Sequence, residues 1–321
     1  MAETGDSGHE TGNGVGVVIP CHNEADSIAS VIRGIRSSLP LSRIVVVDNA
    51  STDGTGEVAR AAGAEVVVEP RLGKGFALLR GFQELANARL VIMIDGDGTY
   101  SSAHAPQLIA AAQRADLVIA TRLDHSTNGA FSFTHSIGNR LFILLVRLLF
   151  GLHTADLLSG YRVLSRRLLD TLPLLSTGFE VETEITIHAL VSGYPVAEVS
   201  APYSARAAGG KSKIRTYHDG SKILLAVLAY FRDYRPLSCF GAIGGALVAG
   251  GLWAGSYPVL EYLETGMVNR LPLAVLAVGL VLLAAMSVIA GLILSSVNRR
   301  SAEMMSRLRR IEVQQRIGKT V

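Results

Sequence analysis

Two long uncharged segments near the end of the chain set the strongest limit on how it can fold. No Asp, Glu, Lys or Arg occurs between Arg235 and Glu261, and none occurs between Arg270 and Arg299. Each segment has about 25 residues or more, which is the length that a helix needs to cross the hydrocarbon core of a bilayer. Buried helices of a soluble core are the alternative, but such helices seldom stay uncharged for so long. The sequence therefore predicts a two-helix transmembrane hairpin over 236–298.

The charges beside these segments predict the orientation of the hairpin. Lysines and arginines precede the first segment and follow the second, whereas the short connecting loop carries one arginine, Arg270. By the positive-inside rule, the loop lies outside and both termini lie in the cytoplasm. We therefore expect a multi-pass protein of the cytoplasmic (inner) membrane, with a flexible tail at 1–14, a cytosolic catalytic domain at 15–235 and a basic cytoplasmic tail at 299–321.

Composition excludes several classes of protein. Of the 321 residues, 49% are hydrophobic and 18% are charged, so a disordered chain is excluded. The net charge of +3 is too small for a nucleic-acid-binding surface, and we expect no nucleic-acid partner. Cys21 and Cys239 are the two cysteines, which excludes a disulfide scaffold and a metal site built from cysteines.

The hydrophobic pattern before residue 236 alternates short strands with helices. Strands are predicted at 14–20, 43–48, 65–69, 90–95 and 116–121. Helices are predicted between them at 28–39, 53–62, 74–86 and 104–114. Because no hairpin turn joins successive strands, the pattern indicates a mostly parallel sheet with helices on both faces, the α/β class. Ligands of such sheets bind at the carboxyl ends of the strands, where the polar residues of this chain gather.

Two further helical segments follow residue 122, where the strand pattern weakens. Segments 135–152 and 217–234 combine apolar residues with charges, and they are too short and too charged to span a bilayer. A helix lying on the bilayer surface fits each of them. A packed core helix fits each equally well, and the pattern does not decide between the two.

The strongest chemical signal is the string Asp95-Gly96-Asp97-Gly98-Thr99, directly after a predicted strand. Two carboxylates at positions i and i+2 provide the hard oxygen ligands that Mg²⁺ or Mn²⁺ prefers, and diphosphate oxygens and water would complete the coordination. Two solvated aspartates in a turn are the alternative. Nearby, the segment 73–75 opens a predicted helix and offers backbone N–H groups for a phosphate.

The D-x-D-G-T string is also typical of haloacid dehalogenase phosphatases, in which the first Asp is the nucleophile and the second is the general acid. In those enzymes the motif closes the first strand of the core, whereas here three strand–helix units precede it. A membrane-anchored protein that binds a nucleotide sugar without turnover is a further alternative. Release of phosphate from a monoester would support the first, and an unaltered donor would support the second.

Three segments in order, 17–24 (VVIPCHNE), 44–55 (IVVVDNASTDGT) and 95–97 (DGD), resemble family 2 glycosyltransferases of the GT-A fold. The resemblance covers residues 15–235. With the hairpin, the segment 159–162 (SGYR) and the basic segment 206–213, the chain is similar to polyprenyl-phosphate (dolichol-phosphate) sugar synthases. This resemblance implies an inverting transfer of a hexose from a UDP-glucose or GDP-mannose type donor to undecaprenyl or dolichyl phosphate. It also implies a homo-oligomer, such as a tetramer.

The resemblance implies roles for individual residues. Asp95 and Asp97 would hold the metal, and Asp97 would act in catalysis together with Arg122, Arg206 and Lys213. The acceptor phosphate would meet Arg206, Ser212 and Lys213. The donor would be bound by Pro20, Asn23, Glu24, Asp48, Lys74, Asp95 and Thr99. The chain departs from the family pattern at Cys21-His22, Asn49 and Thr99, which leaves the nucleotide base and the sugar open.

The chemistry of the implied transfer indicates which groups the site needs. A departing nucleotide diphosphate is highly charged and calls for a divalent cation, whereas an acceptor phosphate is already anionic and needs no general base. Basic residues ahead of the first span would attract an anionic headgroup, although the positive-inside rule explains them equally well. Acidic residues without an evident role are Asp156, Glu180, Glu182 and Glu184, which we expect to position the acceptor or to tune the metal region.

Overall fold

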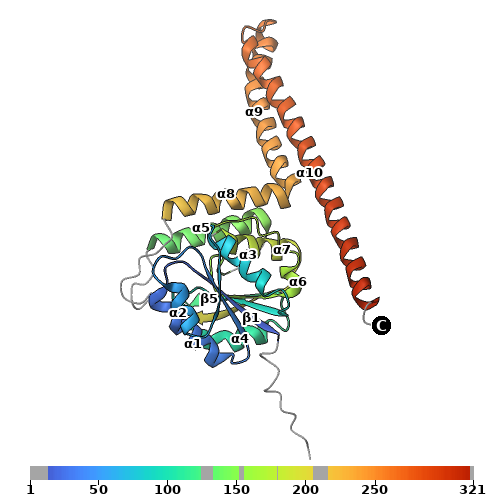
Figure 1. Ribbon diagram of the computed structural model, residues 1–321. Helices are drawn as coiled ribbons and strands as arrows, with labels where there is room; N and C mark the ends of the chain where they lie inside the picture. The colour runs from blue at the N-terminus through green and yellow to red at the C-terminus, as the bar shows by residue number, and fades with distance from the viewer. Residues whose placement is uncertain (1–13, 124–132, 152–154, 179, 205–215, 319–321) are drawn as a thin grey trace, which may run out of the picture. The chain divides into compact units, whose positions relative to one another are not determined.

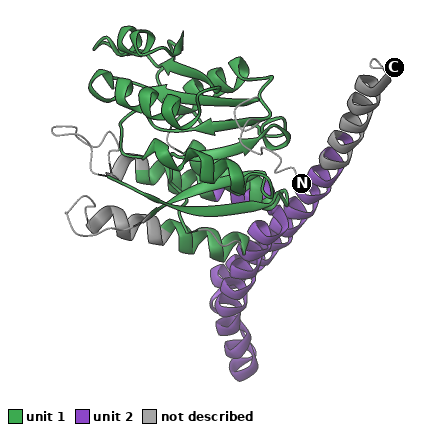
Figure 2. Cartoon of the chain, turned by 90° about the horizontal axis from the view of Figure 1, so that it is seen from below, with its two compact units in different colours: residues 1–227 green, residues 228–321 purple. Residues whose placement is uncertain are grey.

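The computed structural model describes residues 14–123, 133–151, 155–178, 180–204 and 216–318. The chain divides into two compact units, residues 1–227 and residues 228–321 (Figures 1 and 2). The first unit contains the sheet and its covering helices, and the second contains the two long apolar helices. The predicted tail at 1–14 falls, apart from Gly14, outside the described residues.

The first unit is built on one seven-stranded sheet with the order β3-β2-β1-β4-β6-β5-β7. Its strands are β1 (Val15–Cys21), β2 (Arg43–Asp48), β3 (Glu65–Val68), β4 (Leu90–Met93), β5 (Leu117–Leu123), β6 (Arg162–Ser165) and β7 (Val196–Pro202). All neighbouring strands pair in parallel except β6, which is antiparallel to both β4 and β5. The predicted α/β class and mostly parallel sheet are confirmed, and the five predicted strands correspond to β1–β5.

Helices cover both faces of this sheet (Figure 1). They are α1 (Ala25–Ser38), α2 (Thr55–Ala61), α3 (Lys74–Glu84), the short 3₁₀ turn η1 (Ser102–His104), α4 (Ala105–Ala111), α6 (Arg166–Leu169) and α7 (Val181–Val191). Successive side chains of a strand point to opposite faces, so Val17 packs in one hydrophobic cluster with Ile28 of α1, and Val18 packs in the other with Leu78 of α3. The sheet is therefore buried on both sides, which is why its strands read as continuous apolar runs.

The strand register brings three strand ends to one edge of the sheet. Cys21 at the end of β1 pairs with Asp48 at the end of β2, and Val18 pairs with Met93 of β4. The polar residues that follow β1, β2 and β4 therefore meet at this edge, as expected for parallel strands.

Two other helices of this part of the chain carry apolar side chains on more than one face. In α5 (Phe133–Phe150), Val146 is buried while Leu148 is 77% exposed. In α8 (Thr216–Tyr234), Ile223 is buried while Leu225 is 66% exposed. Each helix thus has a packed face, as a core helix does, and also leaves leucines outside. Their contact with a bilayer surface stays a prediction.

The second unit is a pair of helices, α9 (Pro236–Thr265) and α10 (Leu271–Gly318). They contain two candidate membrane spans, Pro236–Thr265 and Leu271–Ser301, whose most apolar windows are only 17% and 11% buried. A core helix of a soluble protein would be mostly buried, so this exposure favours membrane helices over buried core helices. Between the two, Gly244 lies against the backbone of Ala284 and Gly251 lies against that of Ala277, so their missing side chains allow close approach.

Candidate functional site

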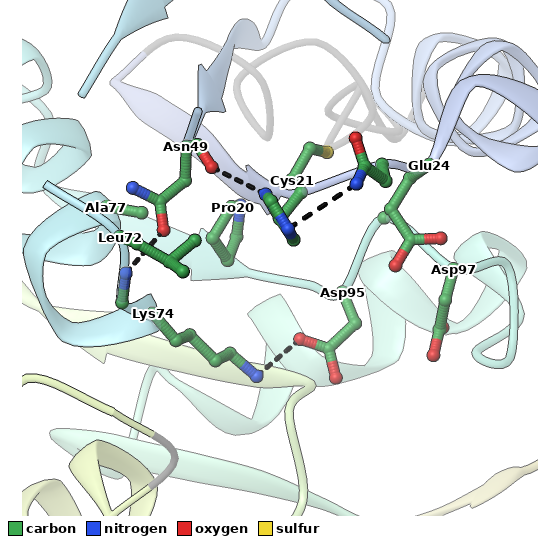
Figure 3. Close-up of a pocket in the computed structure, with 13 residues that line it drawn as sticks. Pro20, Cys21, Glu24, Asn49, Leu72, Lys74, Ala77, Asp95 and Asp97 are labelled. Carbon is green, nitrogen blue, oxygen red and sulfur yellow. Dashed lines mark hydrogen bonds and ion pairs between the residues drawn. The ribbon is translucent and has the colours of Figure 1, made fainter. Parts of the chain in front are cut away.

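A cavity of about 540 Å³ opens where β1, β2 and β4 end (Figure 3). Its wall holds six of the residues predicted to bind the donor or the metal, namely Pro20, Asn23, Glu24, Lys74, Asp95 and Asp97. Asp48, Thr99 and Arg122 are not among the residues that line it. Arg206, Ser212 and Lys213 lie outside the described residues, so their roles stay predictions.

The carboxylate of Asp95 is held by the buried ammonium group of Lys74. Lys74 Nζ lies 2.5 Å from Asp95 Oδ1 and 2.5 Å from Glu182 Oε1, and the lysine side chain is only 11% exposed. Burial alone would lower the pKa of Lys74, but the charges of Asp95 and Glu182 outweigh burial and hold that pKa above its usual value. Burial raises the pKa of the Glu182 carboxyl, against the opposing charge of Lys74. The lysine therefore carries a fixed positive charge at the wall of the cavity (Figure 3).

Asp97 is oriented by its own turn. Its Oδ1 accepts hydrogen bonds from the Thr99 hydroxyl at 2.6 Å and from the Thr99 backbone N–H at 3.1 Å. Thr99 is 2% exposed. Thr99 therefore reaches the site through Asp97, whose carboxylate it fixes at the cavity wall.

The carboxylates at this site fit a divalent cation whose remaining ligands come from a bound molecule and from water. Among the described residues, no group of three or more His, Cys, Asp or Glu side chains is arranged to hold a metal ion. Asp95 and Asp97 supply hard carboxylate oxygens from one turn, and Mg²⁺ binds in this way, through one or two carboxylates plus phosphate oxygens and water. The backbone of Gly160 forms a close cradle for the carboxylate of Asp95, since a Cβ at Gly160 would overlap it.

The cradle is fixed by buried hydroxyl groups. Gly160 N–H donates to the Tyr100 hydroxyl at 3.0 Å, and Ser159 Oγ donates to the backbone oxygen of Ala120 at 2.6 Å. Tyr100 is buried, and burial raises the pKa of its hydroxyl, with the charges of Arg122, Asp95 and Asp156 also acting on it. The SGYR segment is thus a rigid support for Asp95.

Gly160→Ala should displace the carboxylate of Asp95, because neither the supported backbone nor the lysine-bound carboxylate can yield easily. We expect the rate of the reaction at this site to fall by about 10²-fold, as for an ångström-scale misplacement of a reacting group. Steady-state kinetics with far-UV circular dichroism checks this. Gly220→Ala in α8 is the matched control, since no atom lies within 4 Å of a Cβ placed there. Normal kinetics for Gly160→Ala would show that Asp95 needs no such support.

Arg122 at the end of β5 forms a two-pronged ion pair with Asp156, with Nε and Nη2 lying 2.6 and 2.7 Å from the two carboxylate oxygens. Burial would lower the pKa of Arg122, but Asp156 raises it above its usual value. The guanidinium also lies 5.6 Å from the ring centre of Tyr203. Asp156, whose role the sequence left open, therefore orients Arg122.

The side chains of Asp48 and Asn49 form hydrogen bonds with different segments of the chain. Asp48 Oδ1 accepts a hydrogen bond from Ser51 N–H at 3.0 Å and so fixes the turn after β2. Asn49 lines the cavity, donates to the backbone oxygens of Glu69 and Arg71 at 3.0 and 2.7 Å, and accepts from Gly73 N–H at 2.7 Å. An aspartate could not donate those two bonds. The departure from the family pattern at Asn49 thus fixes the loop that leads to Lys74.

The segment 73–75 does not offer a phosphate cradle, which corrects the expectation from its glycines. Gly73 N–H is bonded to Asn49, and Gly75 N–H donates to the backbone oxygen of Thr177 at 3.0 Å. A Cβ at Gly75 would overlap the backbone of Ser176. The glycines therefore permit close packing, and it is the Lys74 side chain that faces the cavity.

The acidic residues around α7 take separate partners. Glu184 accepts hydrogen bonds from Leu175 N–H and Ser176 N–H, both at 2.8 Å, and Glu180 accepts one from Gly178 N–H at 3.1 Å. Glu182 reaches Lys74. The sequence singled out these three residues by their charge, but their partners became visible only in the structure.

Comparisons with known proteins identify the family of this chain. The family described as Glycosyl transferase family 2 matches residues 16–172. Glycosyltransferase AglJ of Haloferax volcanii is 30% identical over 303 residues, which cover 94% of this chain and 99% of that protein. The undecaprenyl-phosphate mannosyltransferase of Micrococcus luteus is 30% identical over 208 residues, which cover 60% of this chain and 84% of that protein.

A solved structure shares the fold. The glucosyl-3-phosphoglycerate synthase of Mycobacterium tuberculosis, crystallised with Mn²⁺, UDP and phosphoglyceric acid, superposes with a TM-score of 0.56 at 26% identity, over 68% of this chain and 78% of that one. The sheet, the strand-end cavity and these likenesses define a glycosyltransferase of the GT-A fold. The chain belongs to glycosyl transferase family 2. The phosphatase alternative is therefore not retained.

Proposed function

We propose that the protein transfers a hexose from a nucleotide-diphosphate sugar to a polyprenyl phosphate, as a membrane-anchored enzyme that uses Mg²⁺ or Mn²⁺. The observation that carries this proposal is the pair Asp95 and Asp97 at the wall of a strand-end cavity, in a chain that also has two candidate membrane spans. The mycobacterial structure with Mn²⁺ and UDP supports the donor class and the metal. The name of the Micrococcus relative supports the acceptor class.

The residues of the cavity have distinct tasks in this proposal. Pro20, Asn23 and Glu24, which line the cavity, would bind the nucleoside end of the donor, and Asp95 and Asp97 would hold the cation. When bound, the cation neutralises the charge that develops on the departing diphosphate. Lys74 adds a second positive charge at the wall of the cavity, held in the resting site by Asp95 and Glu182, and this charge helps to stabilise the leaving group.

The acceptor side needs orientation more than proton transfer. A phosphate oxygen of the lipid attacks the anomeric carbon as the bond to the diphosphate breaks, with inversion at that carbon, and no proton has to leave the attacking oxygen. Arg122, fixed by Asp156, is assigned to the sugar or phosphate end of the donor in this proposal. Arg206, Ser212 and Lys213 precede α8 and receive the lipid phosphate.

The membrane part completes the proposal. The two candidate spans anchor the chain, and the exposed Leu148 and Leu225 of α5 and α8 contact the bilayer surface. Both termini and the catalytic domain lie on the cytosolic side, and copies of the chain associate through the membrane as a homo-oligomer.

The test is a transfer assay with purified full-length protein in lipid nanodiscs. Radiolabelled UDP-glucose or GDP-mannose is supplied with undecaprenyl phosphate, with and without MnCl₂. We expect label in the lipid fraction and release of nucleoside diphosphate, with one donor, only when both the metal and the lipid phosphate are present. A donor that binds, as judged by a thermal shift, but stays unaltered under all conditions would identify a non-catalytic binding protein instead.

A further inference from the structure

The ion pair between Lys74 and Glu182 has no assigned role in the reaction. Three elements meet there, since Lys74 begins α3, Asp95 follows β4 and Glu182 lies in the first turn of α7. Lys74 and Asp95 line the cavity, but Glu182 is not among the lining residues and its side chain is only 4% exposed. Glu182 therefore reaches the site through Lys74.

The environment of Glu182 is unusual for a structural ion pair. Within the part of the chain that the structure describes, no hydrogen-bond donor reaches Glu182 Oε2, although that atom is buried. A buried carboxylate with one unsatisfied oxygen is costly, and replacement of a buried ion pair by apolar side chains is often neutral or stabilising. Stability alone therefore does not account for a charge at this position.

The role of Glu182 follows from competition between Lys74 and a divalent cation for the carboxylate of Asp95. The ammonium of Lys74 contacts Asp95 Oδ1, and a divalent cation bound by Asp95 and Asp97 needs the oxygens of the same carboxylate. Two positive charges at one carboxylate repel each other, so the hold of Lys74 on Asp95 weakens as the cation binds. An ammonium that withdrew from Asp95 without a carboxylate partner would become an uncompensated buried charge. Glu182 is a carboxylate partner that remains.

We propose that Glu182 is a positioning residue that retains Lys74 when the divalent cation binds Asp95, and that it thereby sets the affinity of the D-x-D pair for the cation. This inference rests on the proposed function, because it assumes that Asp95 and Asp97 bind a metal. It assigns Glu182 a role that depends on where its carboxylate lies and not only on its charge.

The experiment measures binding of Mn²⁺ alone to the full-length protein, by the loss of the electron paramagnetic resonance signal of free Mn²⁺. Glu182→Gln should weaken Mn²⁺ binding about tenfold, the usual effect of losing a group behind a metal ligand. Glu182→Asp should weaken it similarly, because the shorter side chain keeps the charge but draws the carboxylate away from Lys74. Lys74→Met should strengthen Mn²⁺ binding, because it removes the competing ammonium.

A double-mutant cycle separates positioning from charge. In the Lys74→Met background, Glu182→Gln should change the Mn²⁺ affinity by less than about twofold, since Glu182 acts through Lys74. Asp116→Asn is the matched control, because Asp116 is a largely buried carboxylate (13% exposed) with its own cation partner, Arg167, at the amino end of β5. The control should bind Mn²⁺ like the wild type.

Three outcomes would overturn the inference. Wild-type affinity in both folded Glu182 variants would show that Lys74 needs no second partner, and an equal loss in both Lys74 backgrounds would show that Glu182 acts on the metal by charge alone. In either case the wild type still binds Mn²⁺ and the proposed function stands. A wild type that binds no Mn²⁺ would remove this inference and the metal site together.

Discussion

Asp95→Ala and Asp97→Ala should each abolish detectable sugar transfer while leaving the protein folded. Each variant removes one of the two carboxylates that would hold the cation in the proposed mechanism, and a bound cation would supply several kcal/mol of charge stabilisation to the departing diphosphate. A loss of about 4 kcal/mol corresponds to roughly a 10³-fold fall in turnover. Folding should survive, because Lys74 keeps Glu182 as a partner in the first variant and the side chain of Asp97 borders the cavity in the second.

The measurement is turnover with saturating donor and lipid acceptor in buffer containing excess Mn²⁺, accompanied by a thermal unfolding curve. Asp170→Ala serves as the control. Asp170 is 61% exposed, and it forms an ion pair with Arg166, one helical turn earlier in the chain. The control should keep wild-type turnover. If Asp95→Ala or Asp97→Ala retained near-normal turnover with excess metal, the metal-dependent mechanism would be wrong.

The position of Asp95 and Asp97, the proposed metal pair, was predictable because its signal is local. Asp95 and Asp97 are two residues apart, they directly follow a strongly apolar strand, and parallel strands bring their ends to one edge. The same reasoning placed Asn23 and Glu24 at the cavity, since they follow the neighbouring strand β1, whereas Pro20 lies within β1 and was suggested by the family resemblance. Where function depends on a strand end, the sequence pattern and the sheet register lead to the same residues.

The support behind the metal pair was not predictable, because it rests on long-range contacts and on elements without a periodic signal. Every residue of α7 from Val181 to Ala189 is buried, polar and apolar alike, so the helix shows no amphipathic period. Strand β6 has four residues and runs against its neighbours, which a strand–helix alternation does not suggest. The sequence indicated only that Glu182 is an acidic residue without an evident role. Its contact with Lys74 is visible only in the fold.

Arg162 is the buried charge on which this support depends, and Arg162→Met should destabilise the catalytic domain more than any other single change considered. The side chain is fully buried and donates to the backbone oxygens of Leu157, Ser159 and Glu182 and to the Thr186 hydroxyl, at 2.7 to 2.8 Å. Methionine fills a similar volume but leaves these acceptors unsatisfied. Breaking such a buried charged network costs about 3–5 kcal/mol.

For a domain of this size, that loss lowers the unfolding midpoint by roughly 6–20 °C. Far-UV circular dichroism is the suitable probe, because the single tryptophan, Trp253, lies in α9 and its fluorescence would report on the hairpin. Arg167→Met is the control: Arg167 is 70% exposed and its pair with Asp116 spans 3.3 Å, so its midpoint should shift by no more than about 1–2 °C. Equal midpoints for the two variants would mean that the SGYR segment holds its shape without Arg162, and the rigid support of Asp95 would then have to come from Tyr100 and Ser159 alone.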